Sequence, residues 1–122
     1  MNKLKISAVL FALPPLVIMF AVLRPGWIVK ILAKRSPDAP LNILITAEYD
    51  RITSKYGKRG VRYAIIEAGH IGQNILLQSE AMGLGAGIVG AFNDEKVRQV
   101  VNIPPNHEPL LILPVGYKTE GL

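Results

Sequence analysis

The sequence contains no cysteine, which excludes disulfide bonds, thiolate metal sites and cysteine nucleophiles. The first 35 residues contain no acidic residue, and they hold six of the 14 basic residues: Lys3, Lys5, Arg24, Lys30, Lys34 and Arg35. The other eight basic residues meet nine acidic ones, so the remaining 87 residues sum to −1. Because a nucleic-acid-binding domain carries its basic excess on the folded part, we expect no nucleic-acid partner.

The N-terminal part contains an uncharged apolar run from Ile6 to Leu23. As an α-helix, this run covers about 27 Å, close to the hydrocarbon thickness of a bilayer. We therefore interpret residues 1–35 as a transmembrane helix, kinked at Pro14-Pro15, with a basic juxtamembrane flank. The basic residues after the run favour a cytoplasmic location for the rest of the chain. A cleaved signal peptide and an accidental leader on a truncated reading frame are the alternatives.

The rest of the chain reads as a linker followed by one small domain. Residues 36–40 contain two prolines and no apolar run, which is typical of a linker. Residues 41–122 predict an α/β (α+β) domain in which a mixed sheet packs against a long buried helix. The expected strands are 41–47, 86–92 and 110–117, and the expected helices are 48–55 (or a turn), 59–82 and 94–102.

Two motifs in this domain resemble known sites but have the wrong context. Residues 85–90 match G-x-G-x-x-G, yet a helix precedes them and no helix opens at their end, so we reject a dinucleotide fingerprint. The glycines would still let a flat ligand approach the backbone. Glu67 and His70 share a helix face, but a di-iron site needs two such pairs, so we expect no metal. Gln73-Asn74 would need partners in a buried helix, either neighbouring backbone or groups at a subunit or cofactor interface.

Five short patterns in order along the chain resemble the nitroreductase family, and within it the branch that includes azoline-oxidising peptide dehydrogenases. They are the Tyr-Gly-x-Arg turn at Tyr56, the Glu-Ala-Gly-His-x-x-Gln-Asn helix at Glu67, the Gly-Leu-Gly-Ala strand entry at Gly83, an acidic helix start at Asp94 and the Leu-x-x-x-Pro-Val-Gly strand that ends at Gly116. The resemblance covers about residues 41–116. It corresponds to the C-terminal half of the family fold.

The resemblance implies an FMN site at a subunit interface and hydride transfer through the flavin, with NAD(P)H as a candidate reductant. By position, the residues that would contact FMN are Ile88, Val89, Gly90, Ala91 and Lys118. Many relatives have proline where Ile88 stands. No residue is assigned as catalytic.

The resemblance also implies a partner, because the long helix would form part of a dimer interface. The family's arginine cluster for the FMN phosphate lies in the N-terminal half, and nothing in residues 1–40 corresponds to it. We therefore expect a homodimer or a complementing chain. The predicted function is an FMN-dependent oxidoreductase of nitroreductase type. The alternatives are a truncated non-catalytic remnant and a membrane-tethered interaction module.

Overall fold

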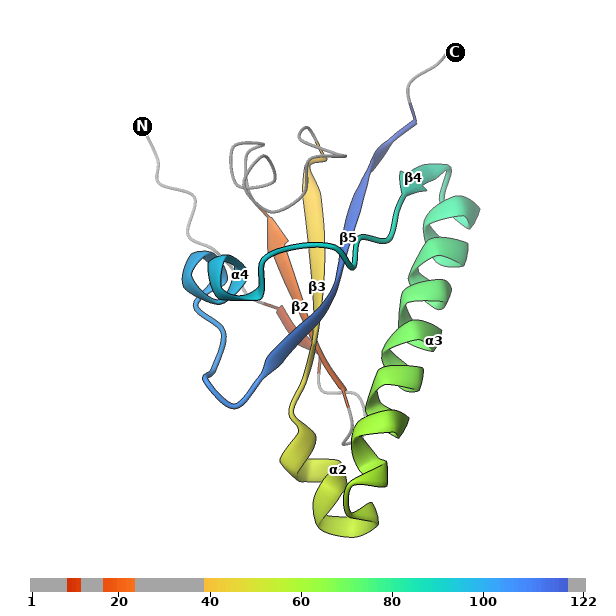
Figure 1. The fold of residues 1–122 in the computed structure, drawn as a ribbon. Helices are drawn as coiled ribbons and strands as arrows, with labels where there is room; N and C mark the ends of the chain where they lie inside the picture. The colour runs from red at the N-terminus through yellow and green to blue at the C-terminus, as the bar shows by residue number, and fades with distance from the viewer. Residues whose placement is uncertain (1–8, 12–16, 24–38, 119–122) are drawn as a thin grey trace.

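The structure is a computed structural model that describes residues 9–11, 17–23 and 39–118 of the 122-residue chain. The described residues form one five-stranded sheet with the strand order β1-β2-β3-β5-β4, and every pair of neighbouring strands is antiparallel. Figure 1 shows the sheet and its helices. The elements are β1 (Val9–Phe11), β2 (Val17–Leu23), β3 (Leu41–Ala47), α2 (Tyr49–Tyr56), α3 (Arg59–Ala81), β4 (Leu84–Ala86), α4 (Asp94–Val101) and β5 (Glu108–Tyr117).

The prediction of one transmembrane helix over residues 6–23 is wrong for the residues of that run that the structure describes, 9–11 and 17–23. These residues form the strands β1 and β2, and β2 pairs with β3 along its whole length, from Val17↔Ala47 to Leu23↔Leu41. An apolar run does not by itself distinguish a helix from buried strands, and Pro14-Pro15 disfavour a continuous helix. Among the helices that the structure describes, none has the length and apolar character needed to cross a bilayer.

Most of the expected flank and linker, residues 24–38, lies outside the described residues. The cytoplasmic location of the remaining chain stays a prediction.

Three of the expected elements are confirmed closely. The strand β3 has the predicted bounds, α3 ends one residue earlier than predicted, and α4 begins at Asp94 as predicted. Asn93 caps α4, because its side-chain oxygen accepts a hydrogen bond from the backbone N–H of Lys96 at 2.9 Å. The expected mixed sheet is corrected, since the described strand pairs are antiparallel throughout.

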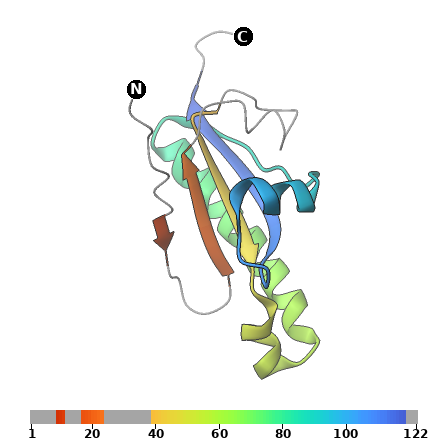
Figure 2. The same cartoon turned by 90° about the vertical axis from the view of Figure 1, so that its left-hand side faces the viewer.

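The helices α3 and α4 cover opposite faces of the sheet (Figure 2). Successive side chains of a strand point to opposite faces of the sheet, so the core has two parts. Ile45 and Leu113 pack with Ala68 of α3, whereas Leu44 and Ile112 pack with Val97 of α4. The pairing of β3 with β5 shifts register between Ile45 and Thr46, which leaves Leu110 as an extra residue. Leu110 and Leu111 consequently both pack on the α3 side.

The long helix α3 is buried on one side only, which corrects the expectation of a fully buried helix. Gly60, Ala64, Ala68 and Gly72, each four residues apart, form the buried stripe. Ile66 and Leu77 on the outer side are 47% and 60% exposed. Gln73 and Asn74 are exposed too, so the described chain does not bury these amides.

Candidate functional site

The candidate cofactor residues Ile88 to Ala91 lie in the connection between β4 and α4, which crosses β5 in Figure 1. Gly83 has a φ of 74° and turns the chain from α3 into β4. The strand expected at 86–92 is only partly formed, because β4 ends at Ala86 and the following residues make an isolated bridge between Val89 and Ile112. We call residues 87–91 the crossing segment.

The crossing segment uses only its alternate backbone groups to bind β5. The N–H of Gly87 donates to the carbonyl of Pro114 at 3.1 Å, and Val89 and Ile112 exchange two hydrogen bonds of 2.8 and 2.9 Å. The intervening N–H groups of Ile88 and Gly90 have no hydrogen-bond partner among the described residues. In an extended chain, successive N–H groups point to opposite sides, so these two point away from β5.

The side chains of the crossing segment alternate between the two faces of the sheet. Val89 packs into the core beneath α4, so its side chain and its N–H are both engaged in the fold. Ile88 lies on the opposite face, where its Cδ1 atom approaches Gly72 of α3. Gly90 also lies on the α3 side, and a Cβ added there would meet only Leu111, at 3.9 Å. That Ile88, Val89, Gly90 and Ala91 contact FMN stays a prediction, and within the segment it is Ile88 and Gly90 whose N–H groups point away from β5.

Lys118 lies apart from the crossing segment. It follows the last residue of β5, whereas Val89 pairs with Ile112 six positions earlier. Six residues of strand span about 20 Å. Its ammonium group contacts the Glu80 carboxylate at 2.5 Å, but both side chains are about half exposed or more. Such a surface ion pair contributes on the order of 0–1 kcal/mol to stability. Because the pair is this weak, an anion could compete with Glu80 for Lys118.

One buried polar cluster has no counterpart among the sequence expectations. Nδ1 of the buried His107 lies 3.0 Å from the Thr46 hydroxyl, and Nε2 lies 3.8 Å from the Glu48 carboxylate. Arg98 donates to the His107 carbonyl, and burial is the main cause that lowers the pKa of His107 below its usual range. The cluster joins α4 to the end of β3. The sequence placed His107 in a proline-rich loop and carried no signal for this burial.

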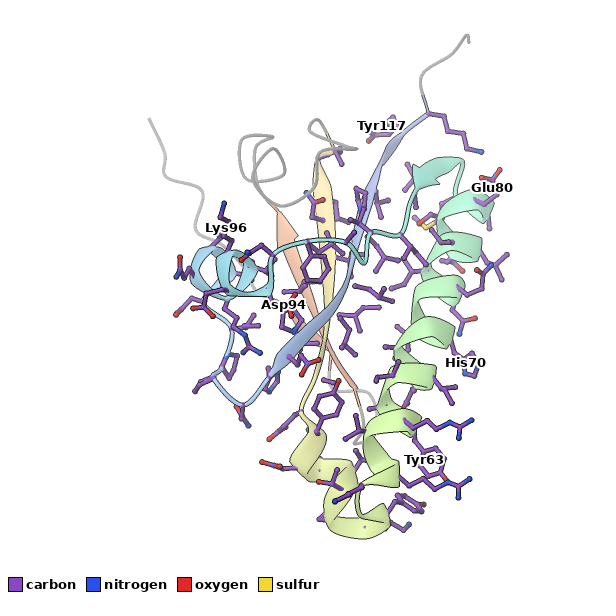
Figure 3. The ribbon with its side chains drawn as sticks, viewed as in Figure 1. Tyr63, His70, Glu80, Asp94, Lys96 and Tyr117 are labelled. Carbon is purple, nitrogen blue, oxygen red and sulfur yellow. The ribbon has the colours of Figure 1, made fainter. Side chains whose placement is uncertain are left out.

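An aromatic and cationic cluster lies where α2 meets α3, at the Tyr56 turn that the sequence analysis noted. The rings of Tyr56 and Tyr63 lie 5.5 Å apart in an edge-to-face arrangement. The Lys55 ammonium lies over the Tyr56 ring at 5.2 Å, and the Arg59 guanidinium lies over Tyr63 at 6.0 Å. Figure 3 shows Tyr63 and His70 pointing away from the sheet on the outer side of α3. Of this cluster, the Tyr63 ring therefore faces outward on α3.

The chain belongs to the nitroreductase family, whose model matches residues 27–117. A curated nitroreductase relative from Methanocaldococcus jannaschii is 45% identical over 82 residues. The alignment covers 67% of this chain and 40% of the relative, so the chain spans less than half of that protein's length.

Solved structures share the fold. A nitroreductase family protein from Streptococcus pneumoniae has a TM-score of 0.75 at 19% identity, with 88% of this chain and 72% of that chain covered. An FMN-dependent nitroreductase from Clostridium difficile has a TM-score of 0.68 at 20% identity, with 87% and 65% covered. A chain of the Escherichia coli microcin synthetase complex has a TM-score of 0.64 at 23% identity, with 68% and 32% covered. The Clostridium difficile protein is described as FMN-dependent, and the microcin synthetase is described as a complex.

Proposed function

We propose that this chain is a flavin oxidoreductase subunit of nitroreductase type that binds FMN beside the crossing segment. When bound, FMN supplies the hydride acceptor and donor, and NAD(P)H is the reductant we expect. The observation that carries the proposal is the pair of N–H groups of Ile88 and Gly90 that point away from β5. Because Gly90 has no side chain, the backbone there is open to a ligand. The role of the protein is then to hold and orient the ring.

The residues of the crossing segment fit the flavin ring. The electron-rich edge of a flavin accepts hydrogen bonds from N–H groups. N–H groups that a neighbouring strand already holds in place can bind this edge without rearranging. Gly90 leaves the backbone uncovered on the α3 side, so a flat ring can approach it. The engaged N–H of Val89 contributes by anchoring the segment to β5, not by touching the ligand.

The described residues fit the FMN phosphate less well. A phosphate is best held by several charge-assisted donors, and arginine pairs are the strongest of them. Lys118 is the one basic side chain expected there, and a single lysine offers less than the several charged donors that a phosphate calls for. We therefore propose that another chain supplies further cations, either a second copy in a homodimer or a complementing subunit. We propose that the partner chain covers the outer side of α3, where Ile66, Leu77 and the Tyr63 ring are exposed.

The visible absorption spectrum of the purified full chain after incubation with FMN tests the proposal. We expect a yellow protein with stoichiometric bound flavin, either alone or when co-expressed with a chain that carries the N-terminal half of the family fold. A colourless protein under both conditions rejects a flavin site and favours a non-catalytic remnant.

Two glycines of the crossing segment provide a matched pair of variants. Gly90→Val places its side chain on the α3 side, where we propose that the ring binds, and should abolish FMN retention. Gly87→Val places the same side chain on the opposite face, where an added Cβ would meet only Pro114 at 3.9 Å, and should retain FMN. Circular dichroism should show unchanged helix content in both. Equal retention by the two variants would contradict the proposed ring position.

A further inference from the structure

Ile88 and Gly72 make a close contact between the crossing segment and α3. A Cβ atom built on Gly72 would lie 3.2 Å from Cδ1 of Ile88 and 3.4 Å from Cδ1 of Leu111. Both distances are shorter than ordinary carbon contacts of about 3.5–4.0 Å. The tip of the Ile88 side chain can therefore lie this close to α3 only because residue 72 is glycine. Gly69, three residues earlier on the same helix, has no atom within 4 Å of such a Cβ.

The contact is one of two that hold the crossing segment from opposite faces. On the α4 side, Val89 packs into the buried cluster of Leu44 and Val97 and is hydrogen-bonded to β5. On the α3 side, the segment contributes Ile88, because Gly90 has no side chain and Ala91 is exposed. Ile88 itself is 43% exposed, so its contact with α3 is local and is not supported by a deep core.

We propose that Gly72 is a positioning residue for this site: it admits Ile88 against α3 and so sets where the outward N–H groups of Ile88 and Gly90 lie. This inference rests on the proposed flavin site for its functional consequence, but the contact itself can be tested without flavin. A methyl group at residue 72 would meet the side-chain tips of Ile88 and Leu111. Of these two residues only Ile88 belongs to the crossing segment, so a displaced Ile88 loosens the contact of the segment with α3. A ring held by these N–H groups then loses its donors while the rest of the fold stays in place.

Gly72→Ala and Gly69→Ala form the matched test, since both add one methyl group to the middle of α3. The amide of Val89 reports on the segment directly by hydrogen exchange. We expect its exchange to be about fivefold to tenfold faster in Gly72→Ala, which corresponds to the lower part of the usual range for overpacking one methyl group. Exchange at the β5 core amide of Leu113 should change far less, which separates a local shift from global unfolding. Gly69→Ala should leave the Val89 exchange unchanged.

The double variant identifies Ile88 as the group through which Gly72 acts. Ile88→Ala alone should loosen the segment, and adding Gly72→Ala should then cause little further change, so the two effects are not additive. For the FMN-bound protein, affinity should fall by the same fivefold to tenfold in Gly72→Ala. The midpoint potential of the flavin should shift to more negative values, because the reduced ring loses N–H donors that stabilise its negative charge.

The outcomes separate the two proposals. If the wild-type chain retains no FMN alone or with a complementing chain, the proposed function fails, and the Val89 exchange still decides whether Gly72 positions the segment. If FMN is retained and Gly72→Ala matches Gly69→Ala in exchange, affinity and potential, the positioning role is overturned. Additive effects of Gly72→Ala and Ile88→Ala would also overturn it, since the two residues would then act independently.

Discussion

Replacement of Gly60 by alanine should weaken the junction of α2 and α3 severely for so small a change. Gly60 is the second residue of α3, and a Cβ built there would lie 2.9 Å from the backbone carbon of Ile52, 3.0 Å from its oxygen and 3.0 Å from the nitrogen of Thr53. These are backbone atoms of α2, which cannot rotate away as a side-chain tip can. The two helices would have to separate, and Ile52, Ala64 and Ala47 would lose part of their packing.

The magnitude follows from two opposed effects. Alanine is favoured over glycine inside a helix by about 1 kcal/mol, and by less in the first turn, where few intrahelical hydrogen bonds are gained. Forcing a methyl group into a packed contact costs about 1–3 kcal/mol, and the backbone contact places Gly60 toward the upper end. We therefore expect Gly60→Ala to lower the free energy of unfolding by about 2 kcal/mol. Gly69→Ala has open space and should raise it by about 0.5–1 kcal/mol.

Urea unfolding of the two variants and the wild type, followed by circular dichroism, measures the difference. With a slope of about 1–2 kcal/mol per molar urea for a small domain, the Gly60→Ala midpoint should fall by roughly 1 M or more. The Gly69→Ala midpoint should rise slightly. A Gly60→Ala midpoint equal to or above the wild-type value would refute the close approach of α2 and α3.

Two further variants test the buried polar cluster and the cap of α4. Because burial lowers the pKa of His107, the unfolded chain binds a proton first as the pH falls, so the stability that this neutral histidine contributes is present above about pH 6.5 and is lost below it. Between pH 7 and pH 5 the thermal midpoint of unfolding should therefore fall in the wild type and fall less in His107→Gln. The control variant His70→Gln changes an exposed histidine and should behave as the wild type. Parallel profiles for all three proteins would contradict a stabilising role of neutral His107. Asn93→Ala removes the acceptor of the Lys96 N–H and should lower the free energy of unfolding by about 1 kcal/mol in urea titrations, whereas Asn93→Asp keeps a cap and should behave as the wild type.

Local signals in the sequence were sufficient for elements whose residues all favour the same structure. LNILITA is short, apolar and rich in branched residues, and it forms β3 with the predicted bounds. Asn93 followed by two acidic residues predicted the start of α4, because capping involves residues that are neighbours in the chain. The same reasoning failed for residues 6–23, since whether an apolar run becomes a helix or strands depends on the strand available to pair with it.

The burial of α3 shows the same division. Its apolar residues on several sides predicted a buried helix, but the sheet and α2 cover only one side of it. The outer residues Ile66 and Leu77 stay exposed in the described chain. Composition reports how much apolar surface a helix carries, whereas the fold decides how much of it one chain can cover.

By itself, the sequence determined the family, the main helices, β3 and β5, because these depend on local patterns and ordered motifs. It predicted a strand over residues 86–92, where the structure has the end of β4 and the crossing segment. Only the tertiary structure decided that the N-terminal apolar run supplies strands and that His107 is buried against Thr46. It also decided that the N–H of Val89 is bound to β5, while those of Ile88 and Gly90 have no partner among the described residues. The physical reason is that each of these facts depends on a partner that lies far away in the sequence: β3 for β2, Thr46 for His107, and Ile112 for Val89.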